Sequence, residues 1–180
     1  MKGRTGPMDE SALRRQLEEH HAASFGWALN CCKQDAVEAE DVLQTAYLNV
    51  LEGRARYGGQ AAFRTWLFAV IRRTAADVRR RRWMQRLGLA RYEQVRRDGG
   101  APEQPPDAIE QSERQAAFLR LLGRLPRRQR EALHLVFYQD LTLEESAGAM
   151  GVSVGSARQH YARGKQRMGE WLSRSEDRHE

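Results

Sequence analysis

A run of glycine and proline near the middle of the chain most limits how this sequence can fold. Three of its five prolines lie in the stretch Gly-Gly-Ala-Pro-Glu-Gln-Pro-Pro at residues 99–106. Proline fixes φ and has no backbone N–H, so neither a helix nor a central strand can cross this stretch. Both flanking blocks have helical periodicity and no useful strand-like alternation. We therefore expect an all-α protein of two small helical domains joined by a flexible linker, the C-terminal one a helix-turn-helix.

The expected domain boundaries follow from this division. We place the first domain at residues 9–83, the linker at 84–112 and the second domain at 113–175. The helices predicted from apolar spacing and from start and stop signals cover residues 10–32, 36–52, 61–82, 111–124, 127–138, 143–150 and, last, from 154 onward.

A helix-turn-helix is encoded almost completely in the last third of the chain. Thr142 and Glu145 form a capping-box pair at the start of a short helix that ends near Met150. Gly151 then permits a left-handed turn, and Ser153 is placed to cap the following helix. This order of signals predicts two helices joined by a tight turn, the arrangement that places a recognition helix in a DNA major groove.

The last helix has two contrasting faces. Residues spaced three or four apart predict a packing face made of Val154, Ala157, Tyr161, Gly164 and Met168. At 100° per residue, the opposite face and its flanks carry Ser156, Arg158, Gln159, Arg163, Lys165 and Gln166. Amide and guanidinium groups on an exposed helix face match the base edges and phosphates of the major groove.

The charge of the chain also favours a polyanionic partner. Its net charge is +6 and its isoelectric point is about 9.8. Six arginines fall between residues 72 and 82, which is more charge than a helix end needs. The preceding loop, at residues 54–59, combines two arginines, a tyrosine and a glycine pair. Single-stranded bases stack on such aromatic and cationic groups, although an ordinary surface turn would also have this composition.

Other functional classes find little support. No apolar run is long enough to span a membrane and the N-terminus lacks a signal-peptide core, so we expect a cytoplasmic protein. There is no catalytic triad, no paired carboxylate site and no phosphate-binding glycine loop, so we expect no enzyme and no cofactor.

Cys31 and Cys32 are adjacent and cannot cross-link a fold. Together with His20 and His21 they lack metal-ligand spacing, so we expect no metal site, and two small hydrophobic residues at a helix end are the simpler interpretation.

Three segments in the observed order resemble the bacterial RNA polymerase sigma factors of the extracytoplasmic-function (ECF) type. Residues 38–52 resemble the region-two helix that docks on the clamp of RNA polymerase, and residues 63–77 resemble the segment that opens and reads the minus-ten promoter element. Residues 125–133 and the helix-turn-helix resemble region four, which reads the minus-thirty-five element. The resemblance implies a non-catalytic subunit that binds core RNA polymerase and promoter DNA, both as duplex and as single strand. It also allows an anti-sigma partner.

Carried over position by position, and combined with the charge pattern, the resemblance gives three sets of candidate residues. Those expected at the minus-thirty-five element are Ser156, Arg158, Gln159, Ala162, Arg163 and Lys165. Those expected at the minus-ten element and in melting are Arg56, Tyr57, Arg64, Trp66, Arg72, Arg73 and Arg79. Those expected at the polymerase clamp are Asp41, Val42, Gln44, Thr45 and Leu48. Arg73 stands where the family usually has asparagine, which shifts that position from base reading toward phosphate binding.

Two other classes remain open on the sequence alone. A free-standing helix-turn-helix regulator would explain the second block and would bind duplex DNA without polymerase, but it gives no role to the acidic helix at 36–52. An adaptor that binds RNA or single strands would use the arginines at 72–82, but it leaves the last helix unexplained.

Overall fold

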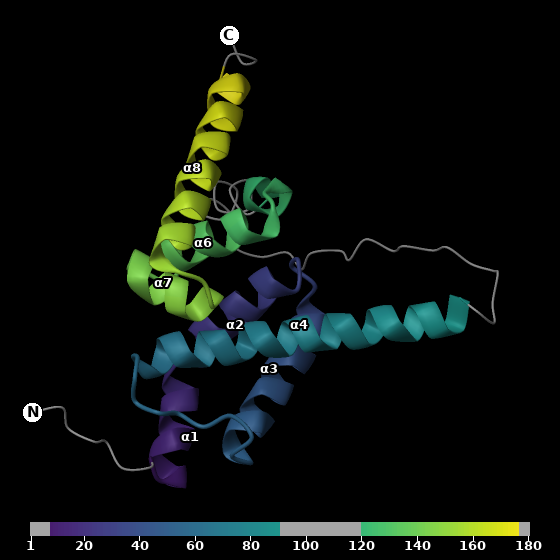
Figure 1. Cartoon of the computed structure of the whole chain (residues 1–180), viewed down its shortest axis with the longest axis vertical. Helices are drawn as coiled ribbons and strands as arrows, with labels where there is room; N and C mark the ends of the chain where they lie inside the picture. Colours follow the sequence, from purple (N-terminus) through teal and green to yellow (C-terminus); the bar gives the residue numbers. More distant parts are fainter. Residues whose placement is uncertain (1–7, 91–119, 177–180) are drawn as a thin grey trace, which may run out of the picture.

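The computed structural model describes residues 8–90 and 120–176, and every regular element in these two ranges is a helix (Figure 1). The first range holds α1 (Glu10–Glu19), α2 (His21–Cys31), α3 (Ala36–Leu51) and α4 (Phe63–Ala90). The second holds helical residues 120–124, followed by α6 (Arg127–Phe137), α7 (Leu143–Met150) and α8 (Val154–Glu176). The expected all-α fold is confirmed.

Short polar side chains start the helices of the first block. The Asp9 carboxylate accepts a hydrogen bond from the Ala12 N–H (2.7 Å) at the start of α1, and Asp35 accepts one from Glu38 N–H (2.9 Å) at the start of α3. The single helix predicted over residues 10–32 is wrong in one respect. The backbone leaves helical geometry at His20 (φ −97°, ψ 9°), which divides it into α1 and α2.

α4 is longer than the sequence suggested. It runs to Ala90, past the end predicted at Arg82, so residues 84–90, where the linker was expected to begin, are helical. Arginine is a good helix former, and an arginine-rich segment carries no stop signal. The rest of the expected linker, and residues 111–119 of the next predicted helix, lie outside the described residues.

The helix-turn-helix has the predicted local geometry. Thr142 Oγ1 accepts a hydrogen bond from Glu145 N–H (3.2 Å), and the Thr142 N–H donates to the Glu145 carboxylate (2.9 Å), which completes the capping box. Gly151 ends α7 in the left-handed region at φ 62°. Ser153 Oγ then accepts from Ser156 N–H (3.2 Å) at the start of α8.

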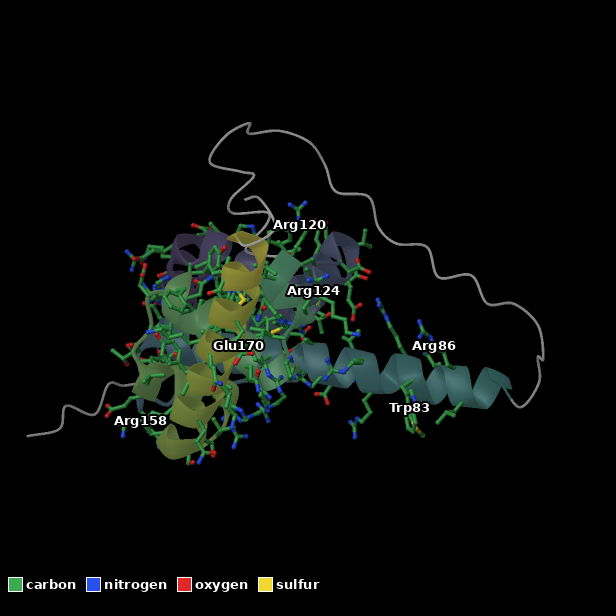
Figure 2. The ribbon with its side chains drawn as sticks, turned by 90° about the horizontal axis from the view of Figure 1, so that it is seen from above. Trp83, Arg86, Arg120, Arg124, Arg158 and Glu170 are labelled. Carbon is green, nitrogen blue, oxygen red and sulfur yellow. The ribbon has the colours of Figure 1, made fainter. Side chains whose placement is uncertain are left out.

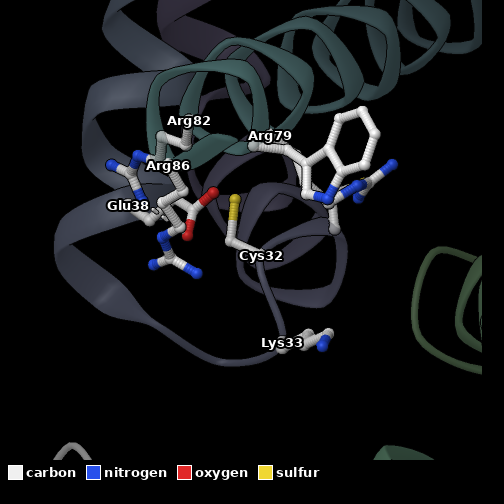
Figure 3. A pocket seen from close by; sticks show the side chains of 8 residues that line it. Cys32, Lys33, Glu38, Arg79, Arg82 and Arg86 are labelled. Carbon is white, nitrogen blue, oxygen red and sulfur yellow. Dashed lines mark ion pairs between the residues drawn. The ribbon is translucent and has the colours of Figure 1, made fainter. Parts of the chain in front are cut away.

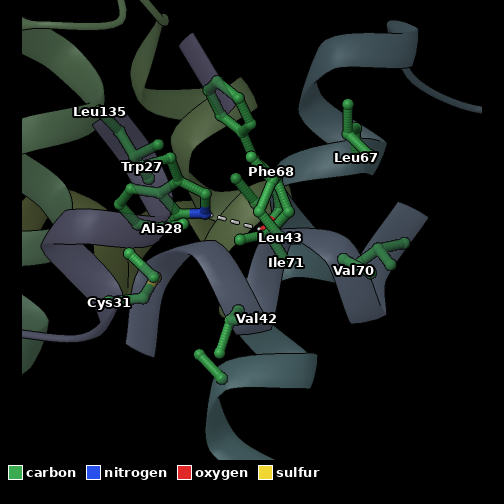
Figure 4. Close-up of a cluster of buried hydrophobic side chains, with 14 of the residues drawn as sticks. Trp27, Ala28, Cys31, Val42, Leu43, Leu67, Phe68, Val70, Ile71 and Leu135 are labelled. Carbon is green, nitrogen blue, oxygen red and sulfur yellow. Dashed lines mark hydrogen bonds between the residues drawn. The ribbon is translucent and has the colours of Figure 1, made fainter. Parts of the chain in front are cut away.

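The two blocks share one hydrophobic core, which no pattern in the sequence predicted. The largest buried group is Trp27 of α2, whose indole N–H donates to the Phe68 carbonyl in α4 (2.9 Å) (Figure 4). The core around it also includes residues of the second block: Ala132, Leu135, Leu141, Ala149 and Met150. A smaller cluster of Leu122, Leu125, Leu133 and Met168 belongs to the second block alone.

The second block packs on the N-terminal half of α4. α7 approaches so closely that a Cβ built on Gly148 would lie 3.3 Å from Thr65 Cγ2. In Figure 1 the C-terminal half of α4 extends beyond the other helices, while α8 stands away from it. Within the described residues no helix is long and apolar enough to span a bilayer.

Candidate nucleic-acid interface

α8 has one buried face and one exposed, mostly cationic face. Ala157 is fully buried, and a Cβ on Gly164 would lie 3.0 Å from Leu133 Cδ1, so α8 meets α6 at close range. Tyr161 stacks on Phe137 with ring centroids 5.9 Å apart. These positions confirm the predicted packing face.

The candidate groove-reading residues lie on the other side of α8. Arg158, Gln159, Ala162, Arg163 and Lys165 are exposed, whereas Ser156 is half-buried and shares a hydrogen bond with Ser153 (2.9 Å). Ser156 therefore takes part in the capping of α8, and the exposed residues are accessible to a ligand. Figure 2 shows Arg158 on the part of the molecule farthest from the free end of α4.

An aromatic cluster joins the loop at residues 52–62 to the start of α4. The rings of Tyr57, Phe63 and Trp66 pack against one another, and the ring centroids of each pair are 5.3 Å apart. The Tyr57 hydroxyl donates to the Ala61 carbonyl (2.6 Å), and Arg56 Nε donates to the Gly53 carbonyl (3.2 Å). The loop is thus fixed by its own side chains. Tyr57 and Trp66 are half-buried within this cluster, next to the half-buried Arg64.

Arg72 is not a free cation in this arrangement. Its Nε donates to Glu131 Oε2 in α6 (3.1 Å), and its side chain is 16% exposed while that of Glu131 is 1% exposed. Glu131 also accepts from Arg127 (2.8 Å) and Arg128 (3.3 Å) on its own helix. The neighbouring Arg73 is exposed, and so is Arg79. Of these three candidate contacts, only Arg72 is held by the second block.

A basic groove of about 250 Å³ lies beside the C-terminal half of α4 (Figure 3). Its cationic lining comes from Lys33, Arg79, Arg82 and Arg86, and Arg82 forms an ion pair with Glu38 (2.9 Å). Trp83 stands at the same groove and is 60% exposed. Trp83 and Arg86 lie on the part of α4 that extends past the body of the protein (Figure 2).

α3 places most of the candidate polymerase contacts on one exposed face. Asp41, Gln44, Thr45 and Leu48 are exposed, and Leu48 remains 49% accessible. Val42 is fully buried in the core, so its side chain offers no surface to a partner in this structure. It lies three residues after Ala39 and four before Ala46, on the packing stripe of α3, which is the physical reason for its burial.

Burial holds two cysteines and one histidine in their neutral forms. Burial raises the pKa of the Cys32 thiol to about 12 and raises that of Cys31 further, so both thiols stay protonated at neutral pH. Burial, with Arg130 nearby, lowers the pKa of His134 to about 4. No group of three or more His, Cys, Asp or Glu side chains within residues 8–90 and 120–176 is arranged to hold a metal ion.

Glu131, Lys33 and Arg86 are the site residues that sequence reasoning missed. A signal for Glu131 was present, because arginines stand three and four residues before it at positions 128 and 127, which is helical ion-pair spacing. Its pairing with Arg72, 59 residues away, has no local signature. Lys33 comes from the turn after α2, which only the fold brings beside α4.

Comparison with known proteins identifies the two blocks. The family model described as Sigma-70 region 2 matches residues 17–85, and the model described as Sigma-70, region 4 matches residues 115–168. The ECF RNA polymerase sigma factor SigL of Mycobacterium tuberculosis is 30% identical over 161 residues, covering 85% of this chain and 86% of SigL. The RNA polymerase sigma factor CarQ of Myxococcus xanthus is 28% identical over 138 residues, covering 77% of this chain and 76% of CarQ.

Two solved structures share the fold. The sigma factor RpoE of Bartonella quintana, in complex with the anti-sigma factor NepR, superposes with a TM-score of 0.67 at 20% identity, covering 89% of this chain and 96% of that one. CnrH, in complex with the cytosolic domain of CnrY, gives a TM-score of 0.61 at 19% identity, covering 92% of this chain and 90% of that one.

Proposed function

The chain belongs to the ECF sigma factors of RNA polymerase, and from this premise we propose which of its surfaces read the promoter and which bind the polymerase. A sigma factor directs core RNA polymerase to specific promoters and starts transcription by recognising and melting them. The observation that carries the assignment of surfaces is α8. It is the second helix of the helix-turn-helix, buries one face against α6 and exposes Gln159, Arg163 and their neighbours on the other.

The exposed face of α8 reads the minus-thirty-five element in this proposal. Gln159 and Arg163 are one helical turn apart and can contact base edges, while Arg158 and Lys165 on the flanks suit phosphates. Each good bidentate contact to a base discriminates by about 1–3 kcal/mol against the wrong base.

The loop and the first half of α4 bind the minus-ten strand. Extruding a base costs a few kcal/mol, which stacking on an aromatic side chain and contacts to the base edge can offset. Tyr57 and Trp66 supply the aromatic surface next to the exposed Arg56. Arg73 and Arg79 supply exposed cations that can bind the phosphate backbone of the DNA strand. The presence of aromatic and cationic groups on adjoining segments supports this assignment.

The exposed face of α3 docks on the polymerase clamp. It combines a carboxylate, two polar groups and an accessible leucine, namely Asp41, Gln44, Thr45 and Leu48. An apolar contact within a polar rim is typical of a protein interface. Val42 is left out of this surface because it is buried.

Two surfaces that each bind DNA weakly can bind a promoter tightly when one polymerase holds both. Attachment makes the second DNA contact intramolecular, which raises the effective affinity without any new contact. In this role the chain is a non-catalytic specificity subunit that acts in the cytoplasm, where bacterial transcription takes place. An anti-sigma factor is a further proposed partner, supported by the complexes in which the two structural neighbours were solved.

Transcription from selected promoters tests the assignment of α8. Promoters would first be selected from a random-sequence library with core polymerase and the wild-type chain. On these templates, Gln159→Ala combined with Arg163→Ala should reduce transcription by about a hundredfold, since two base contacts are lost. Glu170→Ala, on the exposed C-terminal part of the same helix, is the matched control and should transcribe normally. Wild-type transcription by the double variant would show that α8 does not read the promoter.

A second pair of substitutions tests the assignment of α3. Asp41→Lys with Leu48→Glu should weaken binding to core polymerase while the DNA contacts of α8 persist. The matched control is Glu18→Lys, an exposed charge reversal on α1. Equal polymerase binding by the Asp41/Leu48 variant and by wild type would refute a docking role for this face.

A further inference from the structure

Only Arg79 of the basic groove beside the C-terminal half of α4 takes part in the proposed function. Helical spacing puts Arg79, Trp83 and Arg86 on one side of α4, because they are separated by four and by three residues. The other side of the groove comes from the turn between α2 and α3, which contributes Lys33 (Figure 3). The groove therefore gathers cations from two segments that are distant in the sequence.

The groove carries more positive charge than its own carboxylate can neutralise. Four cations and one carboxylate line it, and that carboxylate, Glu38, already forms an ion pair with Arg82 (2.9 Å). Within the described part of the chain no acidic side chain forms an ion pair with Lys33, Arg79 or Arg86. Three cations are thus left to meet an anion from outside the chain.

The surroundings of Arg79 favour a bound oxyanion. Partial desolvation, followed by the like charge of Arg127, lowers the pKa of Arg79 from its ordinary value. An oxyanion in the groove would offset both effects, because a guanidinium pairs with oxyanions through charge-assisted hydrogen bonds. Cys31 and Cys32 also line the groove, and their buried thiols stay protonated, so they do not repel an anion.

Lys33 is fixed at the edge of the groove by an uncommon backbone conformation. Lys33 (φ 58°) and Gln34 (φ 70°) both lie in the left-handed region, which few residues other than glycine adopt. Two hydrogen bonds hold the turn: Gln34 N–H donates to the Leu29 carbonyl (2.8 Å), and Asp35 N–H donates to the Cys32 carbonyl (3.2 Å). A turn fixed in this way reduces the cost of ordering it around a ligand.

A short polyphosphate joined to an aromatic base complements this groove. A terminal phosphate carries a charge of about −1.5 to −2 at pH 7 and three acceptor oxygens, so three separate cations are better matched by linked phosphates than by one. Trp83, 60% exposed at the same groove, offers a ring on which a base can stack. A volume of about 250 Å³ is near the lower end of the range for small-ligand sites.

We propose that this groove is a binding site for a nucleoside di- or triphosphate, whose phosphates bind Lys33, Arg79 and Arg86 and whose base stacks on Trp83. The site goes beyond the proposed function, which needs no small ligand. It gives a role to Lys33, Trp83 and Arg86, which the proposed contacts with promoter and polymerase leave unused.

Isothermal titration calorimetry of the free, full-length chain tests the site. ATP and GTP would be titrated at moderate salt without Mg²⁺, so that the phosphates are free to meet the cations, and pyrophosphate would be titrated as the ligand without a base. At least one of the two nucleotides should bind one-to-one. Pyrophosphate should bind about tenfold more weakly than that nucleotide, which is the expected effect of losing one stacked base. Failure of both nucleotides to bind would overturn the proposal.

Substitutions at the groove separate a built site from general attraction to a basic protein. Arg86→Gln and Lys33→Asn should each weaken nucleotide binding about tenfold, because each removes one charged contact. Asparagine is chosen at position 33 because it tolerates the left-handed backbone there. The matched control is Arg81→Gln, which removes the same charge from an exposed position of α4 outside the groove and should keep the wild-type affinity. Equal losses in Arg86→Gln and Arg81→Gln would overturn the proposal.

The stacking contact has its own test. Trp83→Leu should weaken nucleotide binding about tenfold and leave pyrophosphate binding unchanged, because only the nucleotide has a base. Far-UV circular dichroism of each variant establishes that the helices are retained. Wild-type nucleotide affinity in a folded Trp83→Leu variant would overturn the assignment of the base to Trp83.

A single-stranded oligonucleotide distinguishes the proposal from an extended DNA surface. If the oligonucleotide binds, Arg86→Gln weakens it, Arg81→Gln does not, and neither ATP nor GTP binds, the groove belongs to the DNA surface and the proposal is overturned. None of these titrations contains polymerase or promoter. A chain that binds core polymerase but no nucleotide would therefore refute only the nucleotide site, not the proposed function.

Discussion

The buried imidazole of His134 gives a sharp prediction about how the native state depends on pH. His134 is 4% exposed and packs on Trp27 of the other block, with ring centroids 5.6 Å apart. Its Nδ1 has no hydrogen-bond partner within the described residues, and its Nε2 faces the Gln139 amide nitrogen at 3.3 Å. The amide nitrogen can only donate, so the neutral ring accepts at Nε2. Protonation would put two donors face to face and a charge into the core.

The size and sign of the effect follow from the two pKa values. Burial lowers the pKa of His134 in the folded chain to about 4, below the ordinary value of 6.5 that applies when the chain is unfolded. Between these values the unfolded state binds the extra proton, so stability rises with pH. The contribution is complete above pH 6.5 and is lost as the pH falls from about 6.5 to about 4. The difference between the two pKa values corresponds to about 3 kcal/mol of unfolding free energy.

Urea denaturation followed by far-UV circular dichroism measures this loss. Between pH 7 and pH 4.5 the wild-type chain should lose about 2 kcal/mol more stability than His134→Leu, which has no imidazole to protonate, because most but not all of the contribution is lost at pH 4.5. Carboxylates that titrate in the same range contribute equally to both chains and cancel in the comparison. The matched control is His160→Leu on α8, outside this packing, which should keep the wild-type pH dependence. Parallel pH profiles for the wild type and His134→Leu would refute the reasoning.

Three further predictions concern local structure. Thr142→Ala removes the capping box of α7 and should lower the unfolding free energy by about 1 kcal/mol, visible as a lower thermal midpoint; an unchanged midpoint would contradict this. Gly151→Ala forces a Cβ into the left-handed region at φ 62° and should cost about 1–2 kcal/mol by urea denaturation, whereas neutrality would show that the turn can change its geometry. Cys31 and Cys32 should resist a thiol-reactive disulfide reagent in the folded chain and react once it is unfolded in urea, because burial keeps both thiols protonated; fast reaction at neutral pH in the folded chain would contradict their burial.

Local signals in the sequence predicted the helix-turn-helix well. The Thr142 capping box, the left-handed Gly151 and the packing stripe of α8 each depend on residues a few positions apart, and the structure confirms all three. The break at His20 was missed because no glycine or proline marks it. The extension of α4 was missed because arginines do not end a helix.

Contacts between distant segments were beyond the reach of sequence patterns. The pairing of Arg72 with Glu131 and the packing of Trp27 on His134 join segments that no periodicity relates. At Val42 the helical spacing and the resemblance to the family lead to different predictions. The helical spacing of α3 places it with Ala39 and Ala46 in the core, whereas the carry-over from the family had placed it on the polymerase surface. At Val42 the burial in the structure agrees with the helical spacing.

Binding of the wild-type chain to core RNA polymerase tests the central claim most directly. The two purified components would be mixed at moderate salt and separated by size-exclusion chromatography. A sigma factor should elute with core polymerase in a one-to-one complex and should confer transcription from selected promoters. If the chain elutes alone and binds duplex DNA tightly without polymerase, the assignment is contradicted in favour of a free-standing regulator.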